Sequence, residues 1–147
     1  MKTLITGGTV VTAIDTMDAD VLIDGEKVVA IASPGSHDWT DAADTIIDAT
    51  GKFVVPGGVD PHTHMQLPFG GTYAADSFET GSRAAAWGGT TTIVDFAVQV
   101  KGESLIDGFD TWMAKAEGNC AIDYGLSLIH ISEPTRRATI SRMPSSA

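Results

Sequence analysis

Two histidines separated by one residue are the most informative chemical feature of the chain. His62 and His64 close the segment Gly-Gly-Val-Asp-Pro-His-Thr-His at residues 57–64. On an extended strand, residues i and i+2 point to the same side, so both imidazoles can reach one metal ion from one direction. Imidazole nitrogen is a good zinc ligand at about 2.0–2.1 Å. The spacing therefore indicates a metal site, although a bare His-x-His pair in a random chain is more often structural or merely exposed.

The segments around the pair predict that it lies at the carboxyl end of a parallel strand. Residues 59–64 have the pattern of a strand and its end. Asp76 and Glu79 have the spacing of a capping box, which predicts a helix from 77 to about 87 that stops at two glycines. Residues 91–96 form a β-branched, largely apolar run, which is typical of a buried parallel strand. Sites in α/β proteins are built at such strand ends.

A second helix and a third strand are expected further along. Ser104 can cap a helix that ends at Gly118, and residues 121–124 have the composition of a strand. The apolar residues of this helix share one face because their spacing follows the helical period; they are Leu105, Phe109, Trp112, Met113 and Ala116. The simplest interpretation of Trp112 is a core residue.

The first 55 residues contain strand patterns and no helical period. Residues 4–6 and 10–12 flank a Gly-Gly-Thr segment that predicts a tight turn. An Asp-Gly pair at Asp24 and Gly25 favours a hairpin turn between two apolar runs, and residues 45–48 form a further strand pattern. We therefore predict an all-β opening domain.

The order of elements from residue 56 onward is β-loop-α-β-α-β. This order is typical of α/β folds with a parallel sheet and right-handed crossovers. A (β/α)8 barrel takes roughly 250 residues, and residues 56–125 supply only about a quarter of that length. A barrel, if this is one, is not closed within the chain.

Composition narrows the class of protein. The 147 residues carry a formal net charge of −10, which disfavours nucleic acid and anionic membranes as partners. The chain opens without a signal peptide and has no apolar run of about 18 residues, so a cytoplasmic location is expected. Cys120 is the single cysteine, which rules out an intrachain disulfide, and a small buried residue is its simplest role.

Three motifs together resemble a known family. Residues 47–52, residues 56–69 and residues 88–96 are similar to the amidohydrolase superfamily and, within it, to the dihydropyrimidinase and D-hydantoinase branch. The resemblance runs from Met1 to Gly125. It implies an N-terminal piece of such a protein, with part of a small β-sandwich at residues 1–55 and the first β/α units of a TIM-like (β/α)8 barrel at residues 56–125.

The resemblance also implies a chemistry. Family members hold two zinc ions, and His62 and His64 would bind the more buried one. A carboxylated lysine, two later histidines and a proton-shuttling aspartate would lie beyond this piece, so no catalytic residue is assigned within it. A hydroxide that bridges the metals opens a cyclic amide to an N-carbamoyl amino acid, and two metals acidify the water and polarise the carbonyl. A small cyclic amide is the expected partner, and a homotetramer the expected assembly of the complete protein.

The loop after His64 matches the family's substrate-gating loop. Leu67 and Phe69 occupy positions that contact the substituent of a hydantoin ring, and packing against the barrel rim is an equally good interpretation of both. Asp60 is expected to orient the histidine strand rather than to bind metal. Asp95 is expected either to support the metal ligands or to serve as a cap or loop residue.

The resemblance stops at Gly125, where the charge changes sign. Residues 126–147 carry three arginines against one glutamate, a net charge of +2, whereas residues 1–125 carry −12. Back-translation of residues 126–136 and 141–147 gives the transposon end and the outer adapter of tagmentation sequencing libraries. We therefore interpret residues 126–147 as adapter read-through. On this interpretation the tail takes no part in the fold, and His130 should not be counted as a metal ligand.

Two other functions remain open on the sequence. Allantoinases and dihydroorotases share the His-x-His pair, but the loop at residues 65–69 fits the dihydropyrimidinase branch better. A non-catalytic scaffold protein related to dihydropyrimidinase is the alternative outside enzymes, and retention of both His62 and His64 argues against it. The 147-residue chain itself is expected to be inactive and poorly stable, because strand edges and apolar helix faces would be uncovered.

Overall fold

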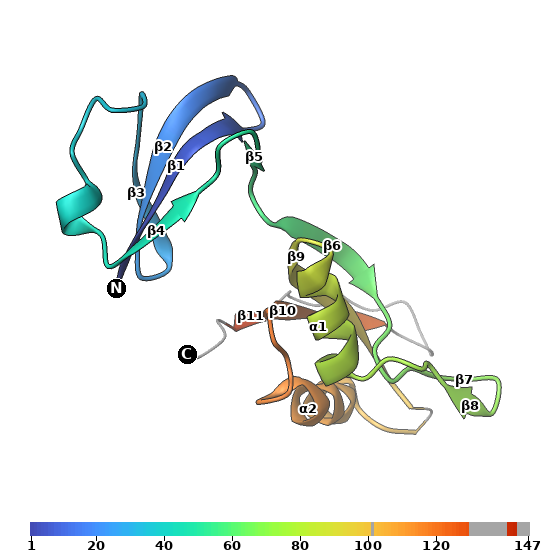
Figure 1. The fold of residues 1–147 in the computed structure, drawn as a ribbon. Helices are drawn as coiled ribbons and strands as arrows, with labels where there is room; N and C mark the ends of the chain where they lie inside the picture. Colours follow the sequence, from blue (N-terminus) through green and yellow to red (C-terminus); the bar gives the residue numbers. More distant parts are fainter. Residues whose placement is uncertain (101, 130–140, 144–147) are drawn as a thin grey trace. The chain divides into compact units, whose positions relative to one another are not determined.

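The chain forms two compact units, Met1–Pro56 and Gly57–Ala147, in a computed structural model that describes residues 1–100, 102–129 and 141–143. The first unit is built from strands and the second alternates strands with helices, so the molecule is mixed α/β (Figure 1). None of the helices in the described ranges is long and apolar enough to cross a membrane.

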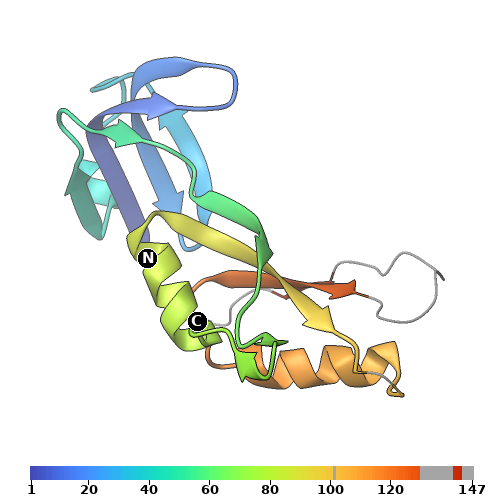
Figure 2. The same ribbon diagram turned by 90° about the vertical axis from the view of Figure 1, so that its right-hand side faces the viewer.

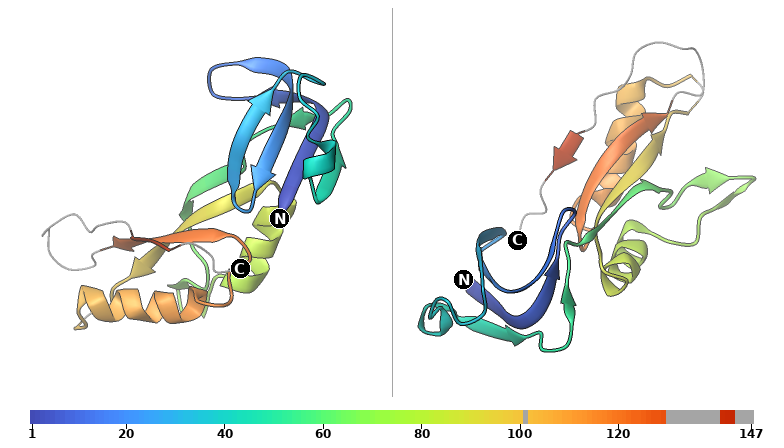
Figure 3. Two further views of the ribbon diagram at one scale, coloured as in Figure 1. Left: turned by 90° about the vertical axis from the view of Figure 1, so that its left-hand side faces the viewer. Right: turned by 90° about the horizontal axis from the view of Figure 1, so that it is seen from above.

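The first unit is a five-stranded sheet. Its strands are β1 Lys2–Val11, β2 Thr16–Asp24, β3 Lys27–Ala32, β4 Thr45–Asp48 and β5 Phe53–Val54, with a 3-10 turn at Thr40–Ala42. The order is β3-β2-β1-β4, and β5 also pairs with β1 (Figure 3). Strand β1 runs antiparallel to β2 and parallel to β4 and β5. The predicted hairpin turn is confirmed, with Gly25 in the left-handed region at φ 59°.

The tight turn predicted at residues 7–9 is wrong, because β1 continues through it as one strand. The register between β1 and β2 shifts between Ile5 and Gly8, which makes this segment a bulge rather than a reversal. The carboxylate of Asp20 accepts hydrogen bonds from the Thr6 hydroxyl (2.7 Å) and the Gly7 amide (3.1 Å). The Asp20 side chain of β2 thus accepts from the Gly7 amide, a donor that the irregular ladder leaves unpaired.

The second unit has a parallel sheet at its centre. Its elements are β6 Gly58–Thr63, β7 Pro68–Phe69, β8 Thr72–Tyr73, α1 Phe78–Trp87, β9 Thr90–Val98, α2 Leu105–Ala116, β10 Asp123–Ile129 and β11 Ser141–Met143. The sheet order is β11-β10-β9-β6, in which β6, β9 and β10 are parallel and β11 is antiparallel. Strands β7 and β8 form a separate hairpin. The predicted alternation of strands and helices is confirmed.

Both helices are capped at the N-terminus by a serine. Ser77 caps α1 through a reciprocal box with Thr80, so the predicted box of Asp76 and Glu79 is wrong by one residue. Glu79 instead pairs with Arg83 at 3.2 Å on the exposed surface of the helix. Helix α1 ends before Gly88 as predicted, and α2 begins at the predicted cap, Ser104.

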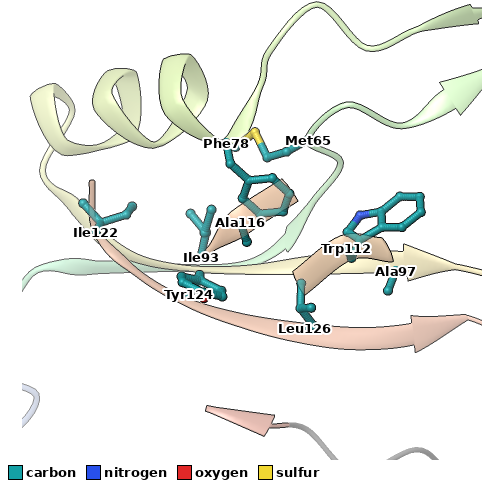
Figure 4. Close-up of a cluster of buried hydrophobic side chains, with 9 residues drawn as sticks. All are labelled: Met65, Phe78, Ile93, Ala97, Trp112, Ala116, Ile122, Tyr124 and Leu126. Atoms are coloured by element: carbon teal, nitrogen blue, oxygen red, sulfur yellow. The ribbon is translucent and has the colours of Figure 1, made fainter. Parts of the chain in front are cut away.

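The core of the second unit lies between the sheet and the two helices, which cover the same face (Figures 2 and 4). Alternate residues of β9 point into it because successive side chains on a strand face opposite sides. Trp112, 2% exposed, is a core residue as predicted. The buried apolar set is Met65, Phe78, Ile93, Ala97, Trp112, Ala116, Ile122, Tyr124 and Leu126.

Strand β10 does not stop at Gly125. It continues to Ile129 in register with β9, and Leu126 is 2% exposed within the core. The expectation that the tail takes no part in the fold is therefore wrong for its first residues. The physical reason is that Leu-Ser-Leu alternates apolar and polar side chains, which is the pattern a strand needs. Residues 130–140 and 144–147, including His130, lie outside the described residues.

Candidate metal centre

The two predicted ligands come together at the end of β6. The Nε2 atoms of His62 and His64 are 3.1 Å apart, and the rings meet edge to face with centroids 4.9 Å apart. A tetrahedral ion with nitrogen ligands at about 2.0–2.1 Å places two of them about 3.3–3.4 Å apart. The pair is therefore within a few tenths of an ångström of the separation that one zinc ion needs.

Phe96 of β9 lies against both imidazoles. Its ring centroid is 4.3 Å from that of His62 and 5.6 Å from that of His64. Strand alternation explains the contact, because Phe96 points away from the helix-covered face on which its neighbour Asp95 is buried. The aromatic ring limits the space available to the two histidine side chains.

Asp95 holds the same strand end from the opposite face. It is fully buried, and its Oδ2 accepts hydrogen bonds from the Thr63 hydroxyl (2.8 Å) and the Met65 backbone amide (2.7 Å). Its Oδ1 accepts one from the Trp112 indole N–H (2.9 Å) of helix α2. The two residues that flank His64 in sequence are thus tied to one carboxylate.

The chain turns immediately beyond this anchor. The side chain of Met65 is buried in the core, and helix α1 packs so closely on it that a Cβ atom at Gly81 would displace the Met65 sulfur. Gln66 adopts a left-handed backbone at φ 51° and donates its amide to the Asp76 carbonyl (2.8 Å). A non-glycine residue in this region carries strain that the surrounding contacts must sustain.

The electrostatics around Asp95 are those of a buried charge. Burial raises the pKa of this carboxyl above its ordinary value, and the bonds from Met65, Thr63 and Trp112 oppose that rise. Lys115 lies over the Trp112 ring, 3.8 Å from its centroid. Burial lowers the pKa of Lys115, and the nearby charge of Asp95 acts in the other direction.

The other predicted residues differ in their surroundings. Asp60 accepts a hydrogen bond from the His62 backbone amide (3.1 Å), which is an orienting contact. Leu67 packs against the core of the unit, whereas Phe69, in the β7–β8 hairpin, is 80% exposed. No group of three or more potential metal-ligating side chains occurs among the described residues, so the histidine pair is at most part of a ligand set.

Sequence reasoning missed two features of this centre. It left the role of Asp95 undecided. It also assigned Trp112 to the core alone, although the indole N–H of Trp112 donates a hydrogen bond to the Asp95 carboxylate. The available signal was an acidic residue within an apolar parallel strand, because a buried charge requires partners. It gave no role to the Phe96 ring, which strand alternation relative to Asp95 would have placed on the histidine face.

The fold and the imidazole pair define a class: a mixed α/β protein with a candidate metal-ligand pair at a parallel-strand end. Comparison with known proteins narrows it. The chain is 63% identical over 131 residues to a D-hydantoinase of Streptomyces coelicolor and 45% identical over 130 residues to the dihydropyrimidinase of Rattus norvegicus. These alignments cover 87% and 85% of the chain.

A solved structure of a dihydropyrimidinase is also similar to the chain. The dihydropyrimidinase from Brevibacillus agri matches with a TM-score of 0.80 at 57% identity, over 87% of this chain and 27% of that one. No protein-family model matches. The chain is therefore homologous to the N-terminal part of D-hydantoinases and dihydropyrimidinases. It spans 28% of the length of the Streptomyces relative and 24% of the rat relative, in their N-terminal part.

Proposed function

We propose that the complete protein hydrolyses cyclic amides, namely dihydropyrimidines or 5-substituted hydantoins, and that His62 and His64 hold a zinc ion for this reaction. The observation that carries the proposal is the 3.1 Å approach of the two Nε2 atoms at a parallel-strand end. The names of the homologues support the substrate class. A bound zinc pair would supply water of lowered pKa and a polarised carbonyl.

The fold supports this proposal in its arrangement. We propose that β6-α1-β9-α2-β10 is the start of a (β/α)8 barrel and that Met1–Pro56 is part of a β-sandwich. Strands β6, β9 and β10 are parallel neighbours with both helices on one face, as successive barrel units require. Strand β6 is an edge strand whose Val59 is 63% exposed, as expected of a sheet that continues in a longer protein.

The residues of this chain have separable roles in the proposed site. The imidazoles would hold the metal, while Asp60 fixes the backbone at His62. Phe69 would contact the ring substituent of the substrate, because its side chain projects from the β7–β8 hairpin. Leu67 would instead hold the loop against the core of the unit, because it packs on that core.

The 147-residue chain is proposed to be inactive by itself. It supplies two imidazoles, and the described residues offer no third ligand beside them. A catalytic zinc site needs at least three protein ligands.

We also propose that residues 126–147 derive from sequencing adapters. Resequencing of the locus with trimmed reads would test this, and a native Leu-Ser-Leu-Ile-His-Ile continuation would refute it.

The function is tested with the uninterrupted gene product. Initial rates are measured on dihydrouracil, hydantoin, allantoin and dihydroorotate, for the wild type and for His62→Ala and His64→Ala. We expect turnover of the first two substrates and its loss in both variants, together with loss of bound zinc. Preference for allantoin or dihydroorotate would reassign the substrate, and a metal-free, inactive wild type would contradict the proposal.

A further inference from the structure

The backbone on both sides of His64 is held by a single side chain. Thr63 precedes this histidine and Met65 follows it, and both donate hydrogen bonds to the same oxygen of Asp95, at 2.8 and 2.7 Å. Thr63 and Asp95 are also register partners of the β6–β9 ladder. Any rotation of the peptide at His64 must therefore lengthen at least one of these two bonds.

The second oxygen of Asp95 connects this strand end to helix α2. The Trp112 indole N–H donates to it at 2.9 Å, and the ring itself is buried beneath Lys115. All three donors are directed at a carboxylate that is fully buried. Because water cannot replace a lost partner there, the geometry of each donor is closely constrained.

Phe96, the next residue of β9, acts on the opposite face of the same two imidazoles. Two consecutive residues of β9 thus restrain the histidine pair. Asp95 holds the backbone on both sides of His64, and the Phe96 ring contacts the imidazoles. The register between β6 and β9 shifts between Asp60 and Thr63, so a regular ladder does not pair the segment that contains His62.

We propose that Asp95 is a positioning residue of the metal centre: it fixes the His62–His64 pair in its ligating geometry through Thr63 and Met65 and couples that geometry to helix α2 through Trp112. This inference rests on the proposed function, because it assumes that the pair ligates metal. Residues that orient metal ligands typically contribute 10–100-fold to metal affinity. A merely structural role for Asp95 would lower stability without changing metal affinity in the folded protein.

The test uses the complete protein stripped of metal and titrated with Zn²⁺ and Co²⁺. Asp95→Asn keeps the side-chain volume but leaves one oxygen to serve three donors. We expect roughly 10–100-fold weaker zinc binding and an altered cobalt absorption spectrum, measured where circular dichroism shows the variant folded. Thr63→Val should weaken binding several-fold, and the conservative Thr63→Ser, which keeps the hydroxyl, should restore it.

Ser82→Ala is the matched structural control. Ser82 is fully buried, and its hydroxyl accepts from the Ala121 amide (2.9 Å) and donates to the Glu79 carbonyl (3.3 Å), neither of which belongs to the histidine strand. It should lose stability and keep metal affinity. Unchanged zinc affinity and cobalt spectrum in Asp95→Asn, with His62→Ala still losing the metal, would overturn the positioning role alone. Full metal affinity in His62→Ala would instead refute the proposed function.

Discussion

Two buried carboxylates, one in each unit, use the same device for different ends. Asp20 accepts from the Thr6 hydroxyl and the Gly7 amide, and Asp95 accepts from the Thr63 hydroxyl and the Met65 amide. In each case a strand side chain secures an irregular stretch of its neighbour. The stretch beside Asp20 is a bulge without metal-ligating side chains, whereas the stretch beside Asp95 carries the imidazole pair.

The two carboxylates differ in their electrostatics. Hydrogen bonding, first from Thr6, lowers the pKa of Asp20 despite partial desolvation, whereas desolvation dominates and raises the pKa of Asp95. The third donor also differs, since Asp20 takes the Gly35 amide (3.3 Å) and Asp95 takes the indole of Trp112. A carboxylate that anchors a strand near solvent is thus readily stabilised in its charged form, whereas the one beneath the candidate metal centre is present despite a desolvation cost.

Removal of each carboxylate should give the largest difference in stability between the two units. Asp95→Ala leaves the Met65 amide and the Trp112 indole buried without an acceptor, so we expect a loss of roughly 3 kcal/mol or more of unfolding free energy. Asp20→Ala should cost about 1–2 kcal/mol, because water can reach its donors. Urea unfolding with hydrogen exchange resolved by segment measures both. Equal losses, or a larger loss for Asp20→Ala, would contradict the greater dependence of the second unit on its buried carboxylate.

The threonine hydroxyls provide a smaller and cleaner contrast. Thr63→Val and Thr6→Val each remove one hydrogen bond to a carboxylate, so both should lose about 1–2 kcal/mol of stability. Only Thr63→Val should weaken zinc binding by the complete protein, because only Thr63 adjoins the imidazoles. Calorimetric zinc titration of the two variants decides the point, and an equal weakening in Thr6→Val would show that metal affinity follows stability in general.

The pH dependence of the first unit should give the smallest effect. The folded state lowers the pKa of Asp20, so the unfolded state binds its proton first as pH falls, and the stabilisation present above about pH 4 is lost below it. Asp20→Asn removes this titrating group. Denaturation of the wild type and of Asp20→Asn between pH 3 and 6 should show a smaller acid-side loss in the variant. Parallel profiles would remove the difference assigned to Asp20.

Local signals in the sequence predicted the elements better than their partners. Ser104, the glycines after α1 and the Asp-Gly turn fixed element ends because the chemistry of a cap or turn resides in one or two residues. The cap of α1 was displaced by one residue, since Asp76 and Ser77 are both good caps and only the observed bonds to Thr80 separate them.

Features that depend on a neighbouring strand could not be predicted in the same way. The bulge at Gly7 requires the carboxylate of Asp20, which comes from the next strand. The histidine pair was predicted from i, i+2 spacing, and the structure brings its nitrogens together. Its support by Asp95 and Phe96 involves residues more than thirty positions away, whose register against β6 no local pattern encodes.

The central claim, that His62 and His64 bind one metal ion, is tested most directly by the zinc content of the complete protein after dialysis against metal-free buffer. We predict bound zinc in the wild type and a clear loss in the double variant His62→Asn, His64→Asn, while Thr6→Val, which alters the other unit, retains the wild-type content. Equal zinc content in the wild type and the folded double variant would contradict the account.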